Sequence, residues 1–116
     1  MLFLQYPKCS TCQKAKKWLD DNGVFYQERN IKEENPSAEE LTEWFQKSGK
    51  SLKSFFNTSG MLYRQHQLKD RLPSMSEEEQ IALLASDGML VKRPLLVGGD
   101  FVLAGFKETE WEKKVT

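Results

Sequence analysis

The side chains best suited to chemistry in this chain are its two cysteines, Cys9 and Cys12, which are separated by two residues. A cysteine attacks disulfides and other soft electrophiles as a thiolate, so its reactivity depends on how far its pKa is lowered. A short apolar run precedes the pair, and apolar residues recur after it at helical spacing. The pattern predicts a strand over residues 2–6, a tight turn, and a helix that begins at or just after Cys9.

This placement predicts different roles for the two thiols. The first turn of a helix presents unpaired backbone N–H groups and a partial positive charge, which would stabilise a thiolate at Cys9. Lys8 is expected to add to the effect. Cys12 lies about one turn further along on the same side, within reach of Cys9 if Cys9 occupies the N-cap position. We therefore expect Cys9 to be the attacking thiol and Cys12 the resolving thiol of a redox pair.

Three other interpretations of the cysteine pair stay open. A structural zinc site needs about four ligands, whereas the chain offers two cysteines and one histidine, His66. A permanent disulfide across so short a loop would remove little chain entropy. The two cysteines could also be inert core residues. The position of the motif between a strand and a helix near the N-terminus favours the redox interpretation, with no bound metal.

Length and composition limit the class of protein. The chain of 116 residues is expected to form one domain over residues 1–116, with a core that needs no disulfides. Its 17 basic and 17 acidic residues give a formal net charge of zero, so no overall field favours nucleic acid or a membrane surface. The opening residues do not resemble a secretory signal, and no segment approaches the roughly 18 apolar residues of a membrane span. Together with the cysteine pair, this favours a reducing, cytoplasmic location.

Further elements follow from periodicity, caps and turn residues. Residues 24–31 read as a second strand, parallel to the first in a right-handed βαβ unit. Ser37 and the capping box at residues 76–79 each begin a helix with an apolar face. Gly98-Gly99-Asp100 predicts a hairpin turn. The other expected elements are a short helix after Ser51, a helix over 61–69, strands over 94–97 and 101–104, and a final helix around 110–114.

The resulting order, β-α-β followed by helices and then β-β-α, is that of a thioredoxin-like α/β fold. It predicts a four-stranded mixed sheet with helices packed on it. The helices over about residues 37–88 would form an inserted helical lobe beyond the minimal core. The thiol site would then lie at the carboxyl end of the first strand, the usual functional edge of such sheets.

Four segments resemble the arsenate reductase (ArsC)/Spx family of thioredoxin-like proteins, and the match covers nearly the whole chain. They are YPKCSTC at 6–12, LKSFFNTSG at 52–60, VKRPLL at 91–96 and VLAGF at 102–106. The resemblance implies that Pro94 is cis and faces the cysteine. It also implies that Arg93 binds an oxyanion or tunes the thiolate. A plainer interpretation is that Arg93 pairs with a surface carboxylate.

Departures from the family pattern bear on the substrate. Arsenate reductases of this type place three arginines around the oxyanion, but here the central equivalent position falls near Asn57 and the late one near Ala104. A dianionic arsenate needs several charge-assisted donors, so the sequence favours a thiol or disulfide substrate. Beside the cysteine pair and Arg93 as catalytic residues, we expect these residues to bind the substrate: Lys8, Ser10, Thr11, Asn57 and Pro94.

The leading functional hypothesis is a thiol-disulfide oxidoreductase that uses the Cys9/Cys12 pair. The resemblance implies a reductant such as glutathione, another low-molecular-weight thiol, or a thioredoxin- or glutaredoxin-type protein. One alternative is an Spx-like redox-sensing regulator, which would act through RNA polymerase because the chain has no DNA-reading motif. The other is a glutathione- or glutaredoxin-dependent arsenate reductase. His66 lies in a polar helix, where we expect it to be solvated.

Overall fold

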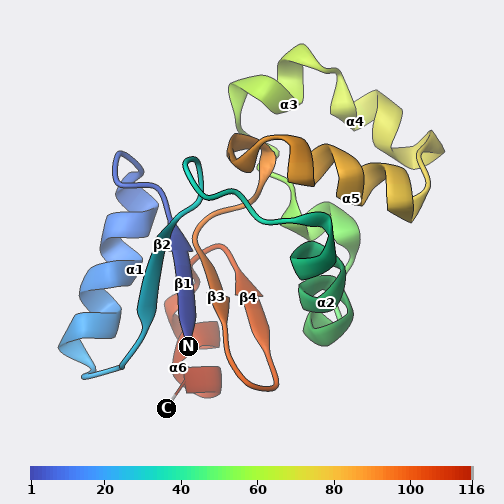
Figure 1. Ribbon diagram of the computed structural model, residues 1–116. Coiled ribbons are helices and arrows are strands. Elements are labelled where there is room, and N and C mark those ends of the chain that lie inside the picture. The colour runs from blue at the N-terminus through green and yellow to red at the C-terminus, as the bar shows by residue number, and fades with distance from the viewer. Residues whose placement is uncertain (116) are drawn as a thin grey trace.

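Four short strands form a mixed sheet at the centre of the computed structural model, which describes residues 1–115 (Figure 1). The strands are β1 (Leu2–Gln5), β2 (Gln27–Asn30), β3 (Leu95–Val97) and β4 (Val102–Ala104), in the spatial order β2-β1-β3-β4. β1 pairs parallel with β2 and antiparallel with β3, and β3 pairs antiparallel with β4 across the predicted Gly-Gly-Asp turn. This arrangement confirms the thioredoxin-like sheet.

Helices cover both faces of the sheet. They are α1 (Ser10–Asp21), α2 (Ala38–Ser48), α3 (Met61–Gln65), α4 (Leu68–Arg71), α5 (Glu77–Ser86) and α6 (Glu108–Val115), with short 3-10 helices η1 (Leu52–Phe55), η2 (Leu72–Ser74) and η3 (Gly88–Leu90). In Figure 1, α1 and α6 lie on the side of the sheet away from α2, and α3 to α5 extend beyond the sheet as a separate layer. All the helices from α2 to α5 lie between β2 and β3 in the sequence.

Successive side chains along the strands point to opposite faces of the sheet and so belong to two different hydrophobic cores. Phe3 and Leu96 pack with Ala15, Leu19 and Trp111 under α1 and α6. Their strand neighbours, such as Leu4 and Leu95, point to the opposite face and join the larger core under α2 to α5. Successive strand residues face opposite sides of a sheet, so each short strand supports both layers. The smaller core holds the thiol-bearing helix α1 against the sheet.

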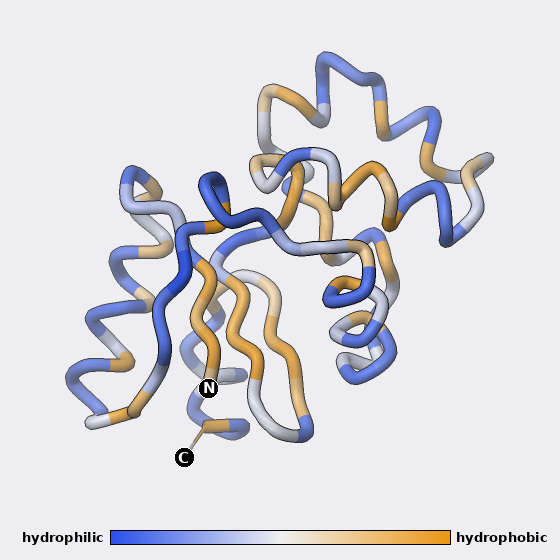
Figure 2. Tube along the Cα trace, viewed as in Figure 1, coloured by the Kyte–Doolittle hydropathy of each residue, from blue (hydrophilic) through white to orange (hydrophobic). Residues whose placement is uncertain are grey.

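The second strand is shorter and more polar than the sequence predicted. Residues 24–26 precede the ladder, because the register begins with Gln27 opposite Leu2, the first residue of β1. Phe25 is almost fully exposed, at 94% of its surface. The strand itself is Gln-Glu-Arg-Asn and forms one edge of the sheet, where Figure 2 shows a hydrophilic trace beside the hydrophobic β1.

The predicted helix over 61–69 was wrong as a continuous element. It is broken into α3 and α4 at Gln67, which has a positive φ of 52°. Tyr63 and Leu68 are both buried in the larger core. Residues five apart on a straight α-helix point about 140° away from each other, so the break allows both side chains to face the core.

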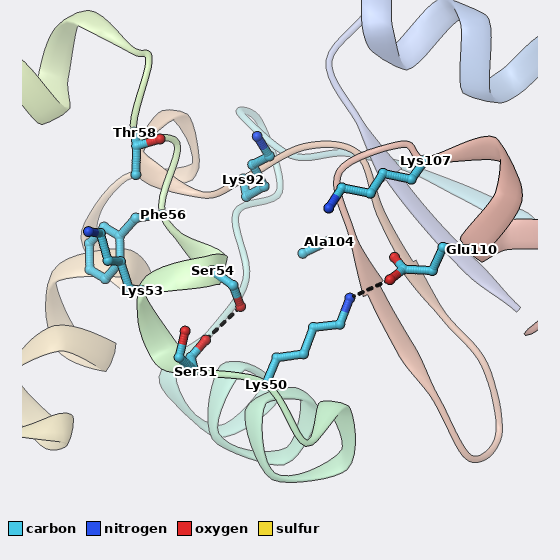
Figure 3. A pocket seen from close by; sticks show the side chains of 10 residues that line it. All are labelled: Lys50, Ser51, Lys53, Ser54, Phe56, Thr58, Lys92, Ala104, Lys107 and Glu110. Atoms are coloured by element: carbon cyan, nitrogen blue, oxygen red, sulfur yellow. Dashed lines mark hydrogen bonds and ion pairs between the residues drawn. The ribbon is translucent and has the colours of Figure 1, made fainter.

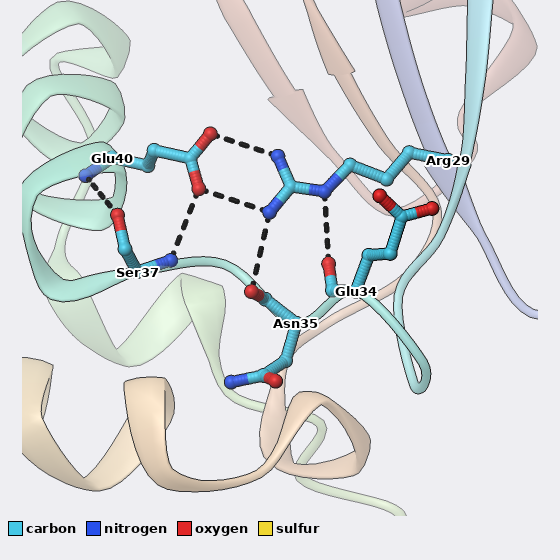
Figure 4. Close-up of polar contacts among 5 residues, drawn as sticks. All are labelled: Arg29, Glu34, Asn35, Ser37 and Glu40. Carbon is cyan, nitrogen blue, oxygen red and sulfur yellow. Dashed lines mark hydrogen bonds and ion pairs between the residues drawn. The ribbon is translucent and has the colours of Figure 1, made fainter.

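Arg29 on the edge strand ties the helical lobe to the sheet. Its guanidinium donates two hydrogen bonds to the Glu40 carboxylate, at 2.8 and 2.9 Å, and others to the carbonyls of Glu34 and Asn35 (Figure 4). Glu40 also completes a capping box with Ser37 at the start of α2. The hydrogen bonds from Arg29 are the main cause that lowers the pKa of Glu40 to about 2. The predicted cap at Ser37 is thus also the anchor of α2.

Within residues 1–115, no helix combines the length and apolar character needed to cross a membrane.

Candidate functional site: the cysteine cleft

Cys9 occupies the N-cap position of α1, which agrees with the predicted helix start at or just after this residue. Its backbone is extended, with φ −92° and ψ 119°, and its carbonyl accepts the first helical hydrogen bond from the N–H of Gln13 at 3.1 Å. The N–H of Cys9 closes the preceding turn on the carbonyl of Tyr6 at 3.0 Å. The turn that follows β1 therefore places the Cys9 side chain at the N-terminus of α1.

The surroundings of Cys9 favour its thiolate. Partial burial opposes ionisation, but hydrogen bonds from the N–H and thiol of Cys12, the charge of Arg93 and the N–H of Thr11 together lower the pKa of Cys9 below its ordinary value. The two backbone N–H groups are among the unpaired donors expected at a helix start. The positive side chain that acts on Cys9 is Arg93, whereas the Lys8 side chain is exposed.

Cys12 lies one turn further along, in the opposite environment. Its side chain is fully buried, and this burial is the main cause that raises the pKa of Cys12 to about 12. The thiol of Cys12 donates its hydrogen bond to Cys9, which also raises the Cys12 pKa. Both cysteines are free thiols in the structure. The two sulfur atoms therefore interact, with the negative charge held by the more exposed one.

Arg93 approaches the cysteines from the loop before β3. The Arg93–Pro94 peptide bond is cis, as the family resemblance implied, and Pro94 is buried. The Arg93 guanidinium lies 5.5 Å from the centre of the Tyr6 ring and donates weakly to the Met89 carbonyl at 3.5 Å. Within residues 1–115 no carboxylate forms an ion pair with it. The interpretation of Arg93 as half of a surface ion pair is therefore wrong.

Asn57 reaches the cleft because residues 55–57 pair with residues 90–92. The N–H of Asn57 donates to the Leu90 carbonyl at 2.8 Å, and the N–H of Lys92 donates to the Phe55 carbonyl at 2.7 Å. This short antiparallel contact joins two segments that the sequence analysis treated separately. A Cβ atom at Gly60 would lie 2.7 Å from the Asn57 amide nitrogen, so glycine leaves room for this side chain.

A cleft of about 340 Å³ opens beside these groups. Four of the expected site residues line it, namely Cys9, Thr11, Asn57 and Arg93. The remaining expected residues are not part of its lining: Lys8 and Ser10 are exposed, and Pro94 and Cys12 are buried behind it. His66 is exposed at the end of α3 and lies outside the cleft, as expected.

Sequence reasoning missed two lysines of the cleft, Lys92 and Lys107, together with the role of Gly105. The N–H of Gly105 donates to the Pro94 carbonyl at 2.8 Å, and its φ of 78° suits glycine. A Cβ there would come within 2.9 Å of the Lys92 side chain, which therefore passes close over the glycine. The adjacency of Lys92 to Arg93 was the one available signal.

A four-stranded mixed sheet, with a CxxC pair at the start of the helix after its first strand, defines a thioredoxin-like protein. The model of the ArsC family matches residues 4–114. The chain belongs to the ArsC family.

Solved structures agree with this assignment. An ArsC family related protein from Bacteroides fragilis is 61% identical, with a TM-score of 0.94 over 97% of this chain and 94% of that one. A "possible arsenate reductase" from Streptococcus mutans is 46% identical, with a TM-score of 0.87 over 96% of both chains. Among curated proteins, the global transcriptional regulator Spx of Streptococcus mutans is 28% identical over 94% of this chain and 77% of its own length. The proteins similar to this chain thus include one described as a possible enzyme and one named as a transcriptional regulator.

Proposed function

We propose that this chain is a thiol-disulfide oxidoreductase in which Cys9 and Cys12 form the redox pair. The observation that carries the proposal is the contrast between the two sulfur atoms. Cys9 lines the cleft and has a lowered pKa. Cys12 is buried, donates a hydrogen bond to Cys9 and has a raised pKa. A reactive thiolate in contact with a protected thiol is the arrangement that two-step disulfide exchange requires.

In the first step, the Cys9 thiolate attacks one sulfur of a substrate disulfide. A bond forms between Cys9 and that sulfur, the substrate S–S bond breaks, and the other half leaves as a thiolate. The positive charge of Arg93 and the N–H groups at the start of α1 favour the attacking anion. The product is a mixed disulfide between Cys9 and one half of the substrate.

In the second step, Cys12 attacks the Cys9 sulfur, and its proton passes to the departing thiolate. Two of the causes that raise the pKa of Cys12 are its hydrogen bond to Cys9 and the negative charge there. Both vanish once Cys9 is in a mixed disulfide, while the attraction of Arg93 for a Cys12 thiolate persists. Formation of the mixed disulfide thus activates the resolving thiol. Overall, one substrate disulfide gains two electrons, and the cysteine pair loses two.

The cycle needs a thiol reductant to restore the pair. Two molecules of glutathione or another small thiol, or one thioredoxin- or glutaredoxin-type dithiol protein, have the required chemistry, since either supplies two electrons by thiol exchange and becomes a disulfide. A reducing compartment such as the cytoplasm suits two free thiols of this kind.

The test is reduction of a small disulfide, followed both by product thiol and by the intact mass of the protein. We expect stoichiometric oxidation to remove two hydrogens from the wild-type chain without unfolding it. Cys9→Ser should reduce turnover by at least about 10³-fold, because Cys9 is the only thiol among residues 1–115 that lines the cleft. Unchanged mass after oxidation, or equal turnover by Cys9→Ser, would refute the proposal.

A second candidate function is a redox-sensing regulator, favoured by the similarity to Spx over nearly the whole chain. In that case the Cys9–Cys12 disulfide would be a signal, and the partner would be a protein such as RNA polymerase. The measurement is binding of purified RNA polymerase to the reduced and oxidised chains. Redox-dependent binding combined with negligible disulfide turnover would place this candidate first.

A further inference from the structure

A second and larger cavity, of about 670 Å³, adjoins the cysteine cleft. Three residues, Lys92, Ala104 and Lys107, line both spaces, so the two lie side by side. The volumes fall in the range of sites for small molecules, roughly 300–1,000 Å³. A ligand with its sulfur at Cys9 can therefore extend past Ala104 into this second space, here called the lysine pocket.

The lysine pocket is strongly cationic. Four lysines line it, Lys50, Lys53, Lys92 and Lys107, against one carboxylate, Glu110. Figure 3 shows the Lys50 and Lys107 side chains extending from different segments toward the space around Ala104. Glu110 pairs with Lys50 at 3.0 Å. Within residues 1–115, no ion pair engages Lys92, Lys107 or Lys53, so their charges are uncompensated.

The lysines come from distant parts of the chain and converge only in the fold. Lys50 follows α2, Lys92 lies on the segment paired with residues 55–57, and Lys107 precedes α6. Lys92 is further positioned by its passage over Gly105. Separate ammonium groups spaced along a cleft suit separate carboxylates on a flexible ligand better than one compact oxyanion, because each lysine acts as a point charge.

We propose that the lysine pocket binds the carboxylates of the disulfide substrate, making the chain selective for anionic low-molecular-weight disulfides. This proposal rests on the proposed function and names its substrate class. The carboxylate-bearing end lies among Lys92, Lys107 and Lys50, and this holds the substrate sulfur against the Cys9 thiolate. The exchange itself is the two-step reaction given above, with a small thiol or dithiol as reductant.

The substrate test compares disulfides of one chemical series. Dithiodibutyrate carries two carboxylates, and bis(2-hydroxyethyl) disulfide carries none. Lys107→Gln removes one uncompensated charge and no hydrogen bond of the fold, while Lys113→Gln, on an exposed residue of α6 outside both cavities, is the matched control. We expect Lys107→Gln to lower kcat/KM for the dicarboxylate about threefold to tenfold, as expected for a partly exposed charge pair. The loss for the neutral substrate should be clearly smaller than for the dicarboxylate, and the Lys113→Gln control should leave both substrates unaffected.

A binding test keeps this inference separate from the proposed function. S-Methylglutathione carries carboxylates but cannot exchange, so calorimetry measures its affinity even if no disulfide is reduced. Saturable binding weakened by Lys107→Gln and Lys92→Gln, and unchanged by Lys113→Gln, is the expected result. Equal affinity in all four proteins, or no saturable binding, would overturn the proposal. If the wild type reduces both disulfides and each lysine variant lowers kcat/KM equally for the two, the proposed oxidoreductase function stands and the proposed selectivity for anionic disulfides fails.

Discussion

The two ends of the first turn of α1 make a direct comparison, because they hold the same side chain in opposite surroundings. Cys9 lies where the helix N–H groups are free and the cleft is open, and its pKa is lowered. Cys12 lies where α1 meets the core, and its pKa is raised to about 12. Only two residues, Ser10 and Thr11, thus separate the proposed nucleophile from the buried thiol. Because both residues are cysteines, the difference between their pKa values comes from their positions on the helix.

The largest expected effect comes from removing the buried member of the pair. In Cys12→Ser the first exchange should proceed and the second should stop, because the resolving thiol is gone. The protein should accumulate as a mixed disulfide or a dimer linked through Cys9. Non-reducing electrophoresis and intact mass measure this product. Release of both halves of a small disulfide as free thiols by Cys12→Ser, in a single turnover without added thiol and at the wild-type rate, would contradict the division of roles.

Alkylation rates sharpen the comparison between the two thiols. A pKa below 9.0 for Cys9 and of about 12 for Cys12 gives Cys9 at least about 10³-fold more thiolate at neutral pH. Intrinsic nucleophilicity falls with pKa and offsets about half of this on a logarithmic scale, so labelling of Cys9 should be faster by at least about 30-fold. Peptide mapping after timed iodoacetamide treatment gives both rates. Equal, slow labelling of both residues would remove the basis for the proposal.

The expectation that the cleft disfavours arsenate can be tested with one substitution. The family resemblance implies that two of the arginines around the oxyanion would fall near Asn57 and Ala104, and each lost donor of a preorganised site typically costs about 10²–10³ in rate. We therefore expect arsenate turnover close to background in the wild type. Asn57→Arg should tighten phosphate binding about tenfold, since a charge-assisted hydrogen bond adds at least that much. Efficient arsenate turnover by the wild type that is lost in Arg93→Ala would favour the arsenate reductase alternative instead.

The smallest expected effects are changes in the titration of each thiol. Arg93→Ala removes a charge that lowers the pKa of Cys9, so its alkylation curve should move to higher pH. Cys9→Ser removes the negative charge that raises the pKa of Cys12, so the curve of Cys12 should move to lower pH. Alkylation rates measured across pH report both shifts. The expected result is a Cys9 curve shifted to higher pH in Arg93→Ala and a Cys12 curve shifted to lower pH in Cys9→Ser. An unshifted Cys12 curve would exclude the idea that forming the mixed disulfide activates Cys12.

Local sequence patterns determined the elements that carry the reactive thiol. The apolar run of β1, the turn and the helical spacing predicted a helix start at or just after Cys9, and in the structure Cys9 is the N-cap of that helix. The capping boxes at Ser37 and Ser76 and the Gly-Gly-Asp hairpin were predicted for the same reason. Each of these features depends on interactions between residues a few positions apart, and such short-range interactions can be predicted from the sequence.

The tertiary structure decided which distant residues meet at the thiol. Asn57 and Arg93 come together because residues 55–57 pair with 90–92, and the lysine pocket forms only where α2, the cis-Pro loop and α6 converge. The same is true of failed predictions: β2 begins at Gln27 because β1 sets the register, and Gln67 breaks a helix so that Tyr63 and Leu68 both reach one core. Contacts between residues far apart in the chain are set by burial and packing of the whole, which no local pattern encodes.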